Sequence, residues 1–75
     1  MRNYLYKNIR NERKHVEIRR YSDGHYSIKQ YIATPTGKNY VGCNLKQNKR
    51  GGIWHRITRR SMVELLEDYE LEVAV

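Results

Sequence analysis

The sequence predicts an α+β fold in which a three- to four-stranded antiparallel β-meander packs on one C-terminal α-helix. Residues 15–57 contain runs in which apolar and polar side chains alternate with a period of two, the pattern of half-buried strands. Turn-forming stretches at 22–24 and 35–38 separate these runs. An apolar stripe with helical spacing follows at 62–69. The 75 residues fit one small domain, which we expect to span residues 15–75.

The first two strands are predicted to form a hairpin with a three-residue loop. Val16 and Ile18 lie on one face of the first strand. A two-residue Asp-Gly turn would pair Ile18 with Lys29 and so mix the buried and exposed faces. A three-residue loop instead pairs Ile18 with Ile28 and gives Gly24 the left-handed conformation that glycine tolerates. The apolar face of the second strand consists of Tyr26, Ile28 and Ile32.

The third strand is predicted to follow a four-residue loop that contains Pro35. Proline lacks the N–H that a strand ladder needs, so a loop position costs it nothing. This loop pairs Ile32 with Val41 and places Tyr31 opposite Gly42, so the apolar faces again agree. The apolar face of the third strand consists of Val41, Cys43 and Leu45.

A short fourth strand is predicted at 53–57, followed by a helix that Thr58 or Ser61 opens. Acidic residues are unfavourable near a helix C-terminus because the helix dipole is negative there. The acids at 67–70 therefore indicate either an early helix end or nearby cations. The helical stripe consists of Met62, Leu65, Leu66 and Tyr69. The sheet face on which it should pack is formed by Val16, Ile28 and Val41.

The sequence leaves two structures open at each end of the chain. Residues 1–14 are predicted to form either a basic N-terminal arm or an extra strand. Residues 71–75 alternate again and predict either a short strand or the unwound end of the helix.

The formal net charge of +7 conceals two oppositely charged regions. All 15 basic residues and three of the eight acids lie in residues 1–60, which therefore carry +12. The other five acids give residues 61–75 a charge of −5. So sharp a separation is typical of distinct faces or tails, and a body this basic favours a polyanionic partner.

Other features argue against membrane, disulfide and catalytic roles. No apolar run reaches the ~18–20 residues that cross a bilayer, and one cysteine cannot form an intramolecular disulfide. We therefore expect a cytoplasmic protein without membrane contact. The histidines and the cysteine lack metal-ligand spacing, and the sequence contains no nucleophile elbow, phosphate loop or paired-carboxylate cleft. No metal, no cofactor and no enzymatic activity are expected.

The exposed face of the sheet is the predicted binding surface, because the helix should cover the other face. Alternation turns cations, aromatic rings and small polar side chains to this exposed face. Cations neutralise phosphates, polar groups read base edges, and aromatic rings stack on unpaired bases. We therefore predict a non-enzymatic domain that binds nucleic acid, DNA rather than RNA. The predicted binding residues are Arg19, Tyr21, Lys29, Tyr31, Tyr40, Asn44, Lys46, Lys49, Arg50, Trp54 and Arg56.

The order of three strands followed by a helix resembles two families of DNA-binding domains. They are the arm-binding domains of some tyrosine recombinases and, more loosely, the plant ethylene-response-factor domain. The similar residues include Asp23-Gly24-His25-Tyr26 and Gly37-Lys38-Asn39-Tyr40. The resemblance implies DNA binding through a sheet that a C-terminal helix backs. The extra segment 53–57 departs from that pattern.

Other functions remain as alternatives. A small, highly charged chain also suits an inhibitor or adaptor of the phage or mobile-element type, which would dock on an acidic patch of a host protein. Gly24-His25-Tyr26 and Tyr40-Val41-Gly42 resemble the paired strand motifs of GIY-YIG nucleases, which implies a minimal nuclease, although His25 replaces the isoleucine of the motif. A ribosome- or complex-associated structural protein is a further alternative. The sequence leaves homo-oligomerisation open.

Overall fold

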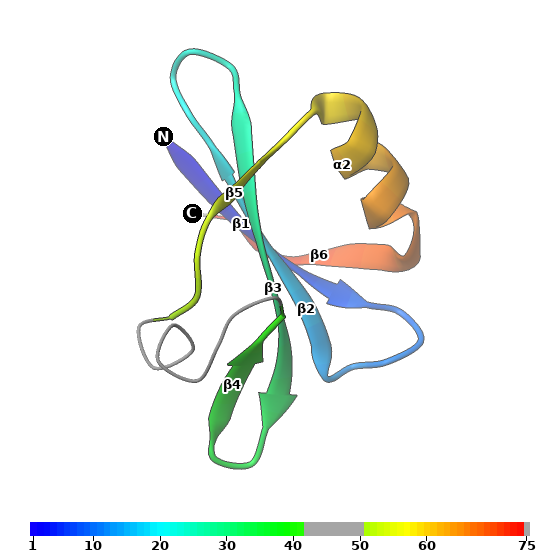
Figure 1. The fold of residues 1–75 in the computed structure, drawn as a ribbon. Coiled ribbons are helices and arrows are strands. Elements are labelled where there is room, and N and C mark those ends of the chain that lie inside the picture. The colour runs from blue at the N-terminus through cyan, green and yellow to red at the C-terminus, as the bar shows by residue number, and fades with distance from the viewer. Residues whose placement is uncertain (42–50, 75) are drawn as a thin grey trace.

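The computed structural model describes residues 1–41 and 51–74, which form one antiparallel sheet with a short helix on one face (Figure 1). The strands are β1 (Arg2–Asn8), β2 (Lys14–Arg20), β3 (Tyr26–Thr34), β4 (Gly37–Tyr40), β5 (His55–Ile57) and β6 (Tyr69–Ala74). Their order is β4-β3-β2-β1-β6, and β5 also pairs with β3. Helix α2 (Arg59–Leu65) continues into the 3-10 turn η1 (Leu66–Asp68). The structure is compatible with the predicted α+β class, but the sheet has six strands rather than three or four.

The hairpin of β2 and β3 has the predicted register and loop. Ile18 pairs with Ile28. The Tyr21 backbone N–H donates to the His25 carbonyl over 3.0 Å and closes the loop. Gly24, inside the loop, has a φ of +93°, which a residue with a side chain rarely adopts. The three-residue loop is therefore confirmed.

The hairpin of β3 and β4 differs from the prediction by two residues. Residues 35–36 alone form the loop, and Ile32 pairs with Asn39 instead of Val41. A shift of two keeps every side chain on its own face, so alternation cannot distinguish the two registers. Strand β4 ends at Tyr40, and Val41 is 53% exposed rather than part of the core. The rest of the predicted third strand, which includes Gly42, Cys43 and Leu45, lies outside the described residues.

Strands β4 and β5 share one edge of β3. Strand β4 pairs with residues 31–34 of β3, and β5 pairs with residues 26–28. Two short strands therefore occupy the edge that the meander prediction gave to one long strand, as Figure 1 shows. Strand β5 corresponds to the predicted fourth strand, although Ile53 precedes it and is exposed.

Both ends of the chain contribute strands to the sheet. Strand β1 pairs with β2 on one side and with β6 on the other, and both pairings are antiparallel. Of the two alternatives for residues 1–14, the structure thus contains the extra strand. The alternating tail belongs to β6 as far as Ala74. The predicted C-terminal helix is therefore followed by a strand.

Helix α2 begins and ends where local chemistry favours it. Thr58 is the N-cap, and its hydroxyl oxygen accepts a hydrogen bond from the Ser61 backbone N–H over 3.2 Å. The helix ends at Leu65, before the acids that would oppose its dipole. Those acids also have nearby cations, since Arg10 pairs with Asp68 over 3.8 Å. No helix in residues 1–41 and 51–74 has the length and apolarity needed to span a membrane.

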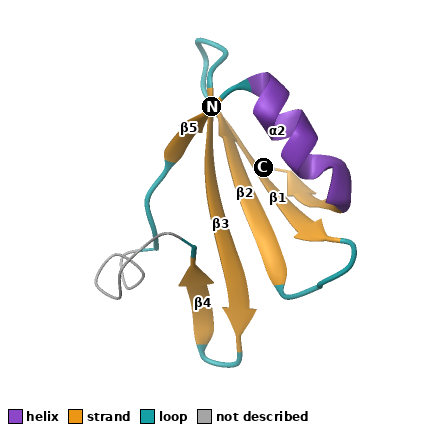
Figure 2. Ribbon diagram, turned by 45° about the vertical axis from the view of Figure 1, so that its right-hand side comes forward, coloured by secondary structure: helices purple, strands orange, loops and turns teal. Residues whose placement is uncertain are grey.

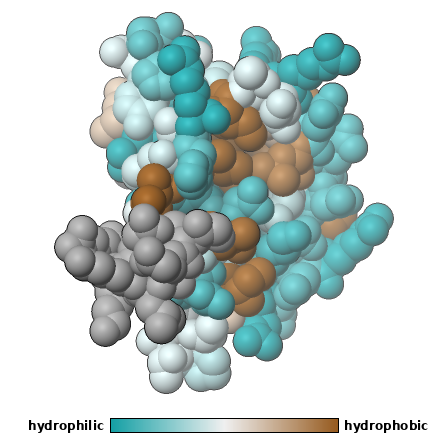
Figure 3. Space-filling view, viewed as in Figure 1, coloured by the Kyte–Doolittle hydropathy of each residue, from teal (hydrophilic) through white to brown (hydrophobic). Residues whose placement is uncertain are grey.

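The core lies between the helix and the sheet, with α2 across one sheet face (Figure 2). Its centre consists of the buried residues Val16, Ile18 and Ile28. The side chains packed around them are Tyr4, Tyr6, Tyr26, Ile57, Met62, Leu65, Leu66 and Tyr69. The predicted helical stripe therefore packs on the predicted face, without Val41. Figure 3 shows hydrophobic side chains between the helix and the sheet, with hydrophilic ones around them.

Candidate nucleic-acid interface

The outer face of the sheet lies opposite α2. It carries the side chains that alternate, along each strand, with the side chains of the core. Its row nearest the β2–β3 turn consists of Asn3, Arg19, Ser27 and Arg56, which pair across four strands. The next row contains Leu5, Glu17 and Lys29, and a third contains Lys7, His15, Tyr31 and Tyr40. The structure thus brings several predicted binding residues to one face: Arg19, Lys29, Tyr31, Tyr40 and Arg56.

Two of the predicted cations are held against Trp54. The Arg19 guanidinium carbon lies 4.2 Å from the centroid of the indole ring, and Lys29 Nζ lies 4.6 Å from it. Lys29 Nζ also donates to the Gly51 carbonyl over 2.8 Å. Arg19 Nε donates to Asn3 Oδ1 over 3.2 Å. Contacts with the ring and with these oxygens engage both charges within the protein.

The two tyrosines predicted to stack on bases are covered. Tyr31 is 5% exposed and Tyr40 is 8% exposed. Their ring centroids lie 5.4 Å apart, and His15 stacks on Tyr31 with a centroid distance of 4.9 Å. Burial raises the pKa of Tyr31 to about 12, because the phenolate would lose its hydration. Contrary to the prediction, these two rings do not offer open faces to a nucleic acid.

Gly52 lies against Tyr40 at a point where a side chain does not fit. Its φ is +80°, and a Cβ there would lie 2.7 Å from two atoms of the Tyr40 ring. We expect Gly52→Ala to lower the free energy of unfolding by about 2–3 kcal/mol, because it adds overlap to backbone strain. Gly51→Ala is the matched control, since Gly51 has a φ of +84° but no atom within 4 Å of the added Cβ.

Urea denaturation of the two glycine variants measures this difference. The control should lose only about 1 kcal/mol, from the left-handed backbone alone. Equal losses in both variants would contradict a role for the Tyr40 contact.

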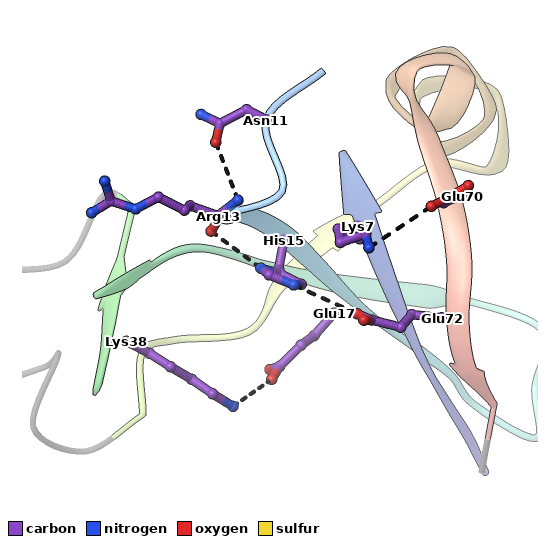
Figure 4. A network of polar contacts seen from close by, with 8 residues as sticks. All are labelled: Lys7, Asn11, Arg13, His15, Glu17, Lys38, Glu70 and Glu72. Atoms are coloured by element: carbon purple, nitrogen blue, oxygen red, sulfur yellow. Dashed lines mark hydrogen bonds and ion pairs between the residues drawn. The ribbon is translucent and has the colours of Figure 1, made fainter. Parts of the chain in front are cut away.

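Carboxylates also reach the outer face, because β6 joins the sheet beside β1. Glu72 lies 3.5 Å from His15 Nε2, and Glu70 lies 4.0 Å from Lys7 Nζ (Figure 4). The sequence placed these acids in or beyond a helix on the opposite side of the sheet. In the structure Glu70 partly neutralises Lys7, and Glu72 adds a further negative charge at this end of the outer face.

Arginines gather at the other end of the sheet, beside the β2–β3 turn. We call this group the arginine end; it consists of Arg2, Arg20, Arg56 and Arg59. In the described part of the chain, none of these four lies within ion-pair distance of a carboxylate. Arg2 and Arg20 are direct cross-strand partners, an arrangement in which like charges repel.

Two clefts open at the arginine end, and Arg20 borders both. The larger has a volume of about 640 Å³ and is also bordered by Arg56, Arg59 and Thr58. The smaller, of about 190 Å³, is also bordered by Arg2. Figure 1 shows the N-terminus, the β2–β3 turn and the start of α2 at this same end.

Sequence reasoning predicted only Arg56 among these four arginines. Arg2 and Arg20 are sequence neighbours of the outer-face residues Asn3 and Arg19, so their side chains belong to the sheet face that the helix covers. Arg59 is the first residue of the helix. These arginines could have been found from their positions in the sequence, because each lies at or near the end of a strand or helix. In an antiparallel sheet, the end of β2 lies beside the start of β1.

The larger cleft is bordered by one acid among the described residues, Asp23, whose carboxylate is already bound. It accepts a hydrogen bond from the His25 backbone N–H over 3.1 Å and contacts His25 Nδ1 as well. These hydrogen bonds lower the pKa of Asp23, and the charge of Arg56 adds a smaller effect.

Tyr21, a predicted binding residue, stacks on His25 with ring centroids 4.1 Å apart. A hydrogen bond with Ser27 lowers the pKa of Tyr21.

The tyrosines of the two nuclease-like motifs lie on opposite faces of the sheet. Tyr26 packs in the core, whereas Tyr40 contacts Tyr31 on the outer face, so the structure does not bring the two motif tyrosines together. Within residues 1–41 and 51–74, no three His, Cys, Asp or Glu side chains form a group that could hold a metal ion. Four predicted binding residues lie outside the described residues: Asn44, Lys46, Lys49 and Arg50.

The chain matches no protein-family model, no curated protein and no solved structure. Its function is therefore inferred from the geometry and charge of the described residues.

Proposed function

We propose that this protein binds nucleic acid without catalysing a reaction, that DNA is favoured over RNA, and that the arginine end makes the main phosphate contacts. The observation that supports this proposal is the group of four arginines around two clefts, none paired with a carboxylate in the described residues. By contrast, Arg19 and Lys29 on the outer face are engaged by Trp54 and by nearby oxygens. The Arg20 guanidinium carbon lies farther from a ring, 6.0 Å from the centroid of Tyr26. The centre of the proposed interface therefore lies at the end of the sheet rather than on its outer face.

The chemistry of the arginine end suits a phosphate backbone. Guanidinium groups stay charged at neutral pH and bind phosphate oxygens through two parallel hydrogen bonds. A phosphate near Arg2 and Arg20 would offset the repulsion between these cross-strand partners. Helix α2 begins with Arg59, which borders the larger cleft, so the start of the helix lies on the side of the proposed interface. The helix thus contributes to the interface instead of repelling DNA.

Salt-dependent binding tests this proposal. Fluorescence anisotropy should be recorded with duplex DNA, single-stranded DNA and RNA of equal length at several salt concentrations. If the four arginines neutralise four phosphates, log affinity should fall against log salt with a slope of about −3.6 for duplex and about −2.8 for single strands. DNA should bind more tightly than RNA of the same length. Absence of binding to all three at low salt would overturn the proposal and favour docking on an acidic protein.

A further inference from the structure

A third concave site lies on the outer face, over β1 and β2. Its volume is about 290 Å³. Trp54 and Val73 border it from opposite edges of the sheet, and Leu5 lines it between them. We call this site the Trp54 hollow.

The Trp54 hollow exposes apolar surface at a concave position. Val73 is 45% exposed, and Leu5 and Trp54 are half-buried. Exposed apolar surface in a concavity is typical of a binding site. The volume is at the lower limit for small-molecule sites, which suits one planar ring system.

Polar groups at the rim of the hollow can bond to the edge of such a ring. Asn3 carries amide N–H donors, and its Oδ1 is fixed by Arg19 Nε over 3.2 Å. Glu17 provides a carboxylate acceptor, which forms an ion pair with Lys38 Nζ over 3.5 Å. The edge of an unpaired nucleobase offers donors and acceptors that complement both groups.

The hollow lies beside the arginine end. Arg19 borders the hollow and is joined through Ser27 to Arg56, which borders the larger cleft. Two strand spacings, about 10 Å, separate Arg19 from Arg56. A strand of nucleic acid with a phosphate bound at Arg56 therefore brings a neighbouring base over the hollow.

We propose that the Trp54 hollow receives an unpaired base, so that the protein prefers single-stranded to duplex nucleic acid. This inference rests on the proposed function. A paired base has its edge engaged and both faces stacked, and it enters such a site only when it is flipped out of the helix. The apolar hollow therefore adds affinity for a single strand that a duplex does not gain.

Filling the hollow tests this inference. Val73→Phe fills it without a change of charge, and Leu71→Phe is the matched control on the same strand. Leu71 is also exposed, but it pairs with Tyr6, whose side chain packs on the core side. We expect Val73→Phe to lower the affinity for a single-stranded DNA 12-mer about tenfold, the equivalent of one base-stacking contact. Its affinity for duplex DNA, and both affinities of Leu71→Phe, should stay unchanged.

The intrinsic fluorescence of Trp54, the sole tryptophan of the chain, gives a second readout. Single-stranded DNA should quench it in the unsubstituted protein, and duplex DNA should not. Equal affinities for single strands and duplex, or an unchanged preference in Val73→Phe, would overturn the inference while leaving the arginine end intact. Failure of the unsubstituted protein to bind either DNA would instead overturn the proposed function. Thermal melting of both variants checks that they fold.

Discussion

Reversing the charge of Arg20, Arg56 and Arg59 to glutamate is expected to lower the affinity for DNA at least about 100-fold at about 0.1 M salt. All three arginines border the larger cleft. If each lost phosphate contact costs about 1 kcal/mol, the three together correspond to a factor of slightly more than 100. The new carboxylates also repel the phosphates. The slope of log affinity against log salt should become shallower by about three.

A second triple variant separates the arginine end from net charge. Arg10, Arg13 and Lys14 lie in or beside the β1–β2 turn, at the opposite end of the sheet. Reversing them changes the formal charge from +7 to +1, as in the first variant. We expect this control to lose less than about fivefold in affinity, because screening weakens charges beyond about 10 Å at 0.1 M salt. Similar losses in both variants, measured by anisotropy, would show that binding follows net charge alone.

Replacing Ile18 with alanine is expected to lower the free energy of unfolding by about 3–4 kcal/mol. Ile18 is 1% exposed and is one of the three buried residues at the centre of the core. The substitution removes apolar contacts of the Ile18 side chain and leaves a cavity that the surrounding tyrosines cannot close. A core of this size provides only about 3–5 kcal/mol, so much of the variant should be unfolded at 25 °C.

Circular dichroism during urea denaturation measures this loss. Val63→Ala is the control, because Val63 lies on the same helix that covers the core but is 55% exposed. Its effect should stay within about 0.5 kcal/mol. If Ile18→Ala cost no more than Val63→Ala, the core would not be centred on Ile18.

Alternation in the sequence predicts faces well and registers only in part. It predicts the pairing of Ile18 with Ile28, because a shift of one residue would bury polar side chains. It does not predict the pairing of Ile32 with Asn39, because a shift of two leaves the faces unchanged. The pairing of β1 with β6 joins opposite ends of the chain, and no local pattern encodes such a partnership.

The candidate site is predictable to a similar extent. The sequence predicts that Arg19, Lys29 and Trp54 lie on the same side, and the structure brings them into contact. It could not predict that those contacts engage the two cations, because they depend on the position of an indole ring from the segment that precedes β5. Nor could it predict that Glu72 would reach His15, because that contact depends on the place of β6 in the sheet.

The pairing of β1 with β6 also has a kinetic consequence. Tyr4 pairs with Ala74, so nearly the whole described chain separates the two partners, whereas β1 and β2 are joined by a short turn. Closing so long a loop costs more chain entropy than closing either hairpin, although the cost rises only with the logarithm of loop length. The local hairpins can therefore form early in folding, and the docking of β6 on β1 is a late step that fixes the acidic strand beside the outer face.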